Sequence, residues 1–164
     1  MRASWWSSST PEGRAAKPSP FRVLLLAAAV PFLLRILKLP ELRFWLEPRG
    51  PLPPSPGPGE VTRMVQRIDR LLAAGRPLVR SGCLTRGVTL YYFLRRAGAG
   101  VSLCFGMGEV QGRFEGHCWI VCQGEPLAER RDPRPLFVET WRIDPLPPGP
   151  LFREGGSVEE VQRG

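Results

Sequence analysis

Two stretches of the chain place hydrophobic side chains at the three- and four-residue spacing that lines one face of a helix. In residues 60–75 the apolar positions that follow this spacing are Val61, Met64, Val65, Ile68, Leu71 and Leu72. Gly75 marks the end of this predicted helix. Residues 83–98 are apolar almost all round between Val88 and Leu94, which predicts a central, buried helix.

Later segments carry the patterns of β-strands. Residues 101–105, 113–122 and 137–143 are each short and rich in β-branched and aromatic side chains. The Gln-Gly pair at 123–124 predicts a turn after the second strand, and the Gly-Met-Gly at 106–108 is interpreted as a turn after the first. Helices followed by antiparallel strands predict an α+β domain whose central helix packs on a small antiparallel sheet.

An apolar and basic segment, residues 21–47, precedes this region. Its longest uncharged apolar run, from Val23 to Leu34, has twelve residues, which is short of the roughly 20 that span a bilayer. Pro31 interrupts the run and Arg35 follows it. We favour a helix that packs on the domain. A helix that lies on a membrane or a partner, and a targeting segment, are the alternatives.

Composition divides the remaining chain into segments. Residues 1–20 are rich in Ser, Pro and Gly without an apolar period, which predicts a disordered N-terminus. In residues 48–59, nine of twelve are Pro or Gly, which predicts a linker. The folded domain is expected at 60–144, and the Pro- and Gly-rich residues 145–164 are expected to form a loose tail.

The chain carries a net charge of +8, and its first half holds all of this excess. Residues 1–82 contain 13 Lys or Arg against 5 acids, whereas residues 83–164 contain 10 of each. A basic half favours an acidic partner, a membrane surface or nucleic acid. However, 21 of the 23 cations are Arg, which a GC-rich genome also produces. No phosphate loop or nucleic-acid motif is present, so we expect no nucleic-acid partner.

Four cysteines and one histidine offer the richest chemistry. The cysteines are too few and too unevenly spaced for a disulfide scaffold, which favours a reducing, cytoplasmic setting. In the strand at 113–122, His117 and Trp119 share one face, and Cys118 and Cys122 share the other. These two cysteines lie about 13 Å apart along a strand, too far for a disulfide or a shared zinc. We therefore expect no metal site.

Cys83 stands at the start of the central helix, directly after Gly82. Unpaired backbone N–H groups and the positive end of the helix dipole stabilise a thiolate at such a position. If His117 lies beside it, the pair has the minimum parts of a cysteine nucleophile and its general base. An acid beyond the turn would orient the imidazole, and Glu129 and Asp132 are the candidates.

Three motifs in order resemble the transglutaminase-like leader peptidases of lasso-peptide biosynthesis. A Cys-Leu-x-Arg motif begins at Cys83 in the stretch LVRSGCLTRGVTLYYFLRRAGAGVSLCFGM. A His-x-Trp motif begins at His117, and a Gly-Glu-Pro at 124–126 follows it, in GHCWIVCQGEPLAE. The resemblance covers residues 60–143 and, more loosely, the Leu-rich helix at 21–46. It implies a transglutaminase-like (papain-like) core in which N-terminal helices precede the central helix and the sheet.

The family resemblance also implies a catalytic triad without a cofactor. Cys83 would be the nucleophile and His117 the general base. The usual aspartate position, twelve residues after the histidine, holds Glu129, and Asp132 is the alternative acid.

Three further residues flank this predicted site. Arg80 and Arg86 would lower the pKa of the nucleophile or meet an acidic peptide, and solvated charges at a helix end are the equal alternative. Trp119 is expected to pack beneath the site, with a substrate contact as the alternative. Tyr91 and Tyr92 are expected in the core.

The implied function is removal of the leader from a ribosomally made precursor peptide by a cytoplasmic cysteine peptidase. The implied partners are a separate small leader-recognition protein and an ATP-dependent macrolactam synthetase. We place the docking surface on the basic segment 22–49 or on the apolar face around Val23–Leu37. Peripheral membrane contact through residues 21–46 is a further option. The alternatives are an acyltransferase that uses an amine as acceptor, a non-catalytic binding module, and a membrane-anchored protein without catalysis.

Overall fold

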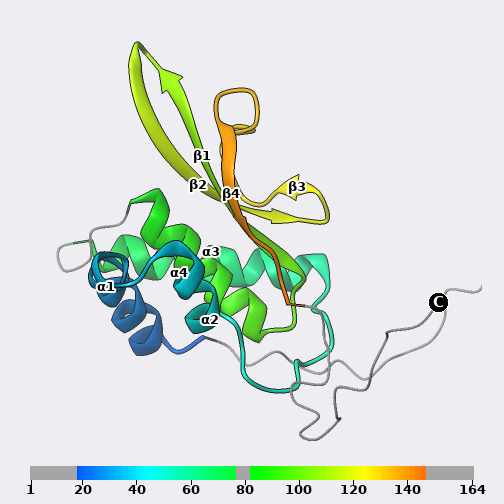
Figure 1. The fold of residues 1–164 in the computed structure, drawn as a ribbon. Coiled ribbons are helices and arrows are strands. Elements are labelled where there is room, and N and C mark those ends of the chain that lie inside the picture. Colours follow the sequence, from blue (N-terminus) through cyan, green and yellow to red (C-terminus); the bar gives the residue numbers. More distant parts are fainter. Residues whose placement is uncertain (1–17, 77–81, 147–164) are drawn as a thin grey trace, which may run out of the picture.

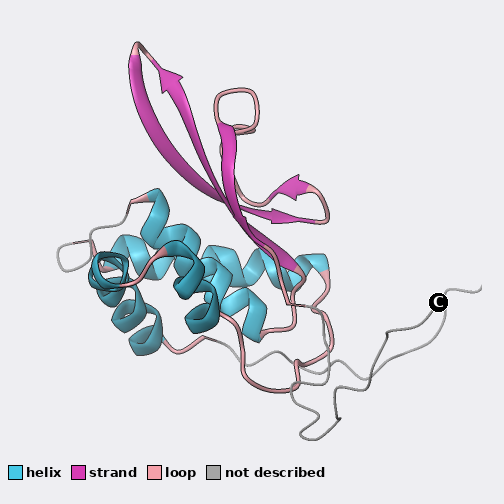
Figure 2. Cartoon of the chain, in the orientation of Figure 1, coloured by secondary structure: helices cyan, strands magenta, loops and turns pink. Residues whose placement is uncertain are grey.

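The computed structural model describes residues 18–76 and 82–146, and its helices and strands form two separate layers (Figure 1). In chain order the elements are α1 (Pro20–Ile36), α2 (Leu39–Leu46), α3 (Pro58–Ala74), α4 (Cys83–Arg96), β1 (Val101–Val110), β2 (Arg113–Cys122), β3 (Glu125–Pro126) and β4 (Val138–Ile143). The strands form one antiparallel sheet in the order β3-β2-β1-β4. The helices gather on one side of it (Figure 2). The α+β prediction is confirmed, while the expectations for residues 1–17 and 147–164 lie outside the described residues.

The main core lies between the helices and one face of the sheet. α4 is central, because Val88, Leu90 and Leu94 are fully buried and the helix contacts both long strands, α1 and α3. α3 buries the apolar face that its sequence pattern predicts. Trp119, on the other face of the sheet, belongs to a second, smaller cluster with Cys104.

The apolar and basic segment at 21–47 forms two helices instead of one. α1 continues through Pro31 and ends at Ile36, and the next two residues, Leu37 and Lys38, are extended. Pro40 lies in the first turn of α2, where its missing N–H costs no hydrogen bond, so it favours the start of a new helix there. α1 packs against α3 and α4 and contributes to their core. Within the described residues, every helix falls short of the length or hydropathy needed to span a bilayer.

A buried charge network fixes the end of α2 to the end of α4. The Glu47 side chain is 6% exposed and accepts hydrogen bonds from Arg95 at 3.1 and 3.4 Å and from the hydroxyl of Tyr91. Arg95 also donates to the carbonyl oxygen of Ala99 at 3.0 Å. An unpaired charge at this depth would be very costly, so each member holds the others in place. Tyr91 is fully buried, as the sequence predicts.

The Pro- and Gly-rich segment after α2 crosses the C-terminal end of α4. Gly98 follows α4 with a φ of 86°, in the left-handed region that favours glycine. A Cβ atom on Gly98 would lie 2.3 Å from the carbonyl oxygen of Pro53. The segment that the sequence predicts as a linker is therefore in contact with the central helix.

The Gly-Met-Gly at 106–108 lies inside β1, so its interpretation as a turn is wrong. A Cβ atom on Gly106 would lie 2.8 Å from the ring of Trp119, and one on Gly108 would lie 1.9 Å from the carbonyl oxygen of Leu136. These glycines permit close packing across the sheet and do not reverse the chain.

Two tight turns join β2 to its neighbours, β1 and β3. The chain reverses after β1 at Gln111-Gly112, where φ is 53° and 75°, and after β2 at Gln123-Gly124, where φ is 52° and 85°. Paired positive φ angles are typical of the two-residue turns that match the twist of an antiparallel hairpin. The turn predicted at residues 123–124 is confirmed.

Candidate active site

Cys83 is the first residue of α4 and lies at the edge of the sheet. Gly82 caps the helix without a side-chain hydrogen bond, so the first turn presents its backbone N–H groups next to the sulfur. The Sγ atom lies 4.0 Å from the carbonyl oxygen of Gly116 in β2. The nucleophile candidate is thus held between a helix N-terminus and the strand that carries His117.

The pKa of Cys83 is lowered from 9.0 to about 5. The largest cause is a hydrogen bond with the side chain of Cys118. A hydrogen bond with the Cys118 backbone, and the hydrogen bond and charge of His117, lower the pKa further. Burial opposes these effects and raises the pKa. At neutral pH the residue is therefore a thiolate, which is the reactive form of cysteine.

Cys118 supports the nucleophile from beneath. Its Sγ lies 3.1 Å from the carbonyl oxygen of Cys83. The Cys118 thiol can therefore donate a hydrogen bond either to this oxygen or to the Cys83 sulfur. The thiolate at Cys83 and burial raise the pKa of Cys118, which keeps it protonated and able to donate. The sequence predicts only packing for this residue, because its contact with α4 depends on how the helix crosses the sheet.

His117 lies between the nucleophile and an acid. Its Nε2 atom is 3.3 Å from Oε2 of Glu129, and both side chains are mostly buried. A carboxylate only accepts hydrogen bonds, so Nε2 carries the hydrogen and Nδ1 is left as the basic nitrogen. The rings of Phe137 and Trp119 pack against the imidazole, with centroids 5.1 and 6.0 Å away.

Arg86 holds the acid in place. Its guanidinium donates to Oε1 of Glu129 at 2.9 Å, to both carboxylate oxygens of Asp69 at 2.8 and 3.1 Å, and to the carbonyl oxygen of Ala128 at 3.0 Å. Arg86 is therefore not a free solvated charge, and it is not among the causes of the low pKa of Cys83. Contact with an acidic peptide stays a prediction. Arg86 links α3 and α4 to the segment that carries Glu129.

The other predicted site residues occupy different positions. The carboxylate of Asp132 is bonded by Arg134 at 2.6 to 2.9 Å, which lowers its pKa, and Glu129 instead contacts the imidazole. Arg80 lies outside the described residues. Trp119 is 2% exposed and packs as core beside the histidine.

A cleft of about 800 Å³ contains these groups. Its walls come from the end of α3, the start of α4, β2 and residues 128–137. In the described part of the chain, no three His, Cys, Asp or Glu side chains are grouped to hold a metal ion. An open cleft with a thiolate, an imidazole and an orienting carboxylate is suited to covalent chemistry on a carbonyl carbon.

Asp69 is a site-supporting residue that the sequence analysis does not identify. It is one of only two acids in α3, and its position on the polar face of an amphipathic helix is typical of a solvated charge. Only the crossing of α3 and α4 brings it to Arg86, 17 residues further along the chain.

Comparison with known protein families adds an independent finding. Residues 25–142, most of the chain, match the Transglutaminase-like superfamily, and the match includes most of α1 as well as the cleft. No curated protein and no solved structure shows a significant match to this sequence. The chain therefore belongs to the transglutaminase-like superfamily.

Proposed function

We propose that the protein is a cysteine peptidase that removes the leader from a ribosomally made lasso-peptide precursor. The observation that carries this proposal is the meeting of Cys83, His117 and Glu129 in one open cleft. The superfamily includes cysteine peptidases, which supports the reaction class. The Cys-Leu-x-Arg and His-x-Trp motifs support the choice of substrate.

The geometry accommodates the reaction in two steps. The Cys83 thiolate attacks the carbonyl carbon at the leader–core junction, and the backbone N–H of Cys83 is placed to donate to the oxyanion. His117 gives a proton to the leaving amine, which frees the core peptide and leaves the leader as a thioester on sulfur. His117 then takes a proton from water, the hydroxide attacks the thioester carbonyl, and the C–S bond breaks, which releases the leader as a carboxylic acid and restores the thiolate beside protonated His117.

Glu129 and Arg86 act through the imidazole. Glu129 keeps the hydrogen on Nε2 and balances the positive charge that His117 carries after each protonation. Arg86 fixes the second oxygen of the same carboxylate, so Glu129 has little freedom to turn away.

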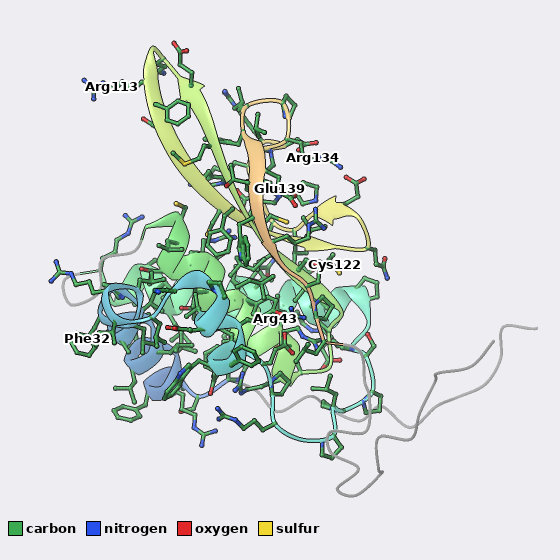
Figure 3. All side chains as sticks on the ribbon, in the orientation of Figure 1. Phe32, Arg43, Arg113, Cys122, Arg134 and Glu139 are labelled. Carbon is green, nitrogen blue, oxygen red and sulfur yellow. The ribbon has the colours of Figure 1, made fainter. Side chains whose placement is uncertain are left out.

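We further propose that a leader-recognition protein docks on the outer face of α1 and α2. Six large hydrophobic side chains there are each more than half exposed: Phe21, Leu25, Phe32, Ile36, Phe44 and Trp45. We call them the α1–α2 apolar surface, and Figure 3 shows Phe32 pointing away from the molecule. Large apolar side chains that are exposed together are typical of a protein-interaction site.

Mass spectrometry of a cleavage reaction tests the peptidase. The purified protein is mixed with the recognition protein and the precursor peptide from neighbouring reading frames, and we expect separate leader and core. Cys83→Ala and His117→Ala should leave the precursor intact, and Glu129→Gln should slow cleavage on the order of 100-fold. Phe32→Ser should weaken stimulation by the recognition protein only.

The matched control is Cys122→Ala, which removes a half-buried cysteine at the end of β2, outside the residues that line the cleft, and should cleave normally. Unchanged cleavage by Cys83→Ala would refute the peptidase. A leader joined to an added amine would identify an acyltransferase, and binding without any product would identify a non-catalytic module.

A further inference from the structure

The carboxylates that line the cleft are all engaged by guanidinium groups. Asp69 and Glu129 share Arg86, and Asp132 is bonded by Arg134. The two guanidinium groups offset two of the three carboxylate charges, so these five groups leave one net negative charge, which the three arginines described next exceed.

Three further arginines line the same cleft: Arg76, Arg130 and Arg131. All three are exposed, and in the described residues no carboxylate lies within ion-pair distance of any of them. Arg76 follows α3, whereas Arg130 and Arg131 follow Glu129. The positive charge therefore approaches the cleft from two separate segments.

The cleft also has an apolar wall. Leu72, Leu136 and Phe137 line it, and Leu136 is 48% exposed although it is a large hydrophobic side chain. A few charged groups beside an apolar wall are typical of a site that binds one ligand in one orientation.

We infer that the cleft selects peptides that carry an acidic side chain close to the bond to be cleaved; this rests on the proposed function. A carboxylate can pair with two N–H groups of one guanidinium, which gives orientation as well as attraction. The unpaired arginines also raise the local concentration of anionic ligands near Cys83. Salt weakens this attraction, because the arginines are exposed.

Alkylation of Cys83 by two reagents tests the charge of the cleft without any substrate. Iodoacetate is anionic and iodoacetamide is neutral, and both form the same bond to the sulfur with loss of iodide. Rates at Cys83 are followed by peptide mapping at pH 8, where the thiolate is fully formed because its pKa is about 5. The measured quantity is the ratio of the iodoacetate rate to the iodoacetamide rate.

The variant Arg130→Glu/Arg131→Glu should lower this ratio by about threefold or more, and 0.5 M salt should lower it in the unmodified protein. Arg113→Glu is the control, since Arg113 is exposed at the far tip of the β1–β2 hairpin (Figure 3). Equal ratios in the unmodified protein, the double variant and Arg113→Glu would overturn the inference. A Cys83 that reacts with neither reagent would overturn the proposed function and the inference together.

Paired peptides provide the second arm. Two precursor peptides that differ by one Asp→Asn change beside the cleavage site should differ about tenfold in kcat/KM, and the double variant should lose this preference. Equal cleavage of both peptides refutes the inference and leaves the peptidase intact. If neither peptide is cleaved, the proposed peptidase activity is refuted. The ratio of the two alkylation rates then tests on its own whether the cleft prefers anionic ligands.

Discussion

Few atoms determine the reactivity of Cys83. Two of its favourable interactions come from Cys118, which follows His117 directly in β2. Because one strand supplies both the base and the neighbouring thiol, the position of β2 relative to α4 controls the charge state of the sulfur.

The low pKa of Cys83 predicts an unusual pH dependence. Alkylation by iodoacetamide should rise through a midpoint near pH 5 in the folded protein, and in strong denaturant the midpoint should move towards 9.0. Since folding lowers this pKa, the thiolate contributes to stability as pH rises from about 5 to 9, and the contribution is lost as pH falls through 5. Rates measured from pH 3 to 10 give the midpoint.

Cys118→Ala should raise the midpoint, because it removes the largest favourable interaction. Cys122→Ala, on the same strand, serves as the comparison and should leave it unchanged. A folded midpoint near 9 would contradict the prediction.

The residues of the triad follow from the sequence for a physical reason. A helix start and an alternating strand both have fixed side-chain directions, so local patterns make Cys83 and His117 candidates, and the family motifs select them as a pair. Glu129 follows from its distance to the histidine in the family motif. The partners of Arg86 cannot be predicted in this way, because Asp69 reaches Arg86 only through the packing of α3 on α4.

At the scale of elements, hydrophobic periodicity predicts the helices well, but local sequence does not predict the structural role of each glycine. α3 and α4 end close to the predicted Gly75 and Gly98. The Gly-Met-Gly at 106–108 has the composition of a turn, yet its glycines are required by the approach of the Trp119 ring and the backbone at Leu136. Local sequence cannot separate these two uses of glycine, since the approaching atoms come from distant segments.

Gly108→Ala should destabilise the protein by about 1–3 kcal/mol, as forced overpacking does. The new methyl group would lie 1.9 Å from a carbonyl oxygen, so either β1 or the segment at 136–137 must move. Phe137 packs on His117, so cleavage should fall as well. Urea denaturation gives the free energy of unfolding.

Gly100→Ala is the matched control, because its Cβ atom would have no neighbour within 4 Å. If the two variants are equally stable, the close approach does not constrain the fold.

At the scale of the whole molecule, the two N-terminal helices pack with α4, the helix that begins at Cys83, in one core. The ion pair between Glu47 and Arg95 lies at the opposite end of α4 from Cys83. α4 is therefore fixed at one end by this buried pair and at the other by the contacts of Arg86.

Glu47→Gln should lower the free energy of unfolding by about 3 kcal/mol or more, because it leaves the charge of Arg95 buried without a counter-charge. Glu115→Gln makes the same chemical change on an exposed strand position and should have little effect. Thermal and urea unfolding of the two variants measure the difference. Similar losses in both would show that the buried pair does not hold the helices together.

One glycine of α4 links helix packing to the depth of Cys83 in the cleft. A Cβ atom on Gly87 would lie 2.5 Å from the Sγ of Cys118, so the absent side chain allows the helix to rest on β2. Gly87 lies one turn beyond Cys83, on the same side of the helix. The depth of the nucleophile is thus a property of the helix–sheet contact. An engineer who wants to bring Cys83 closer to the cleft mouth must shift the helix as a whole, because smaller side chains on the cleft walls leave that depth unchanged.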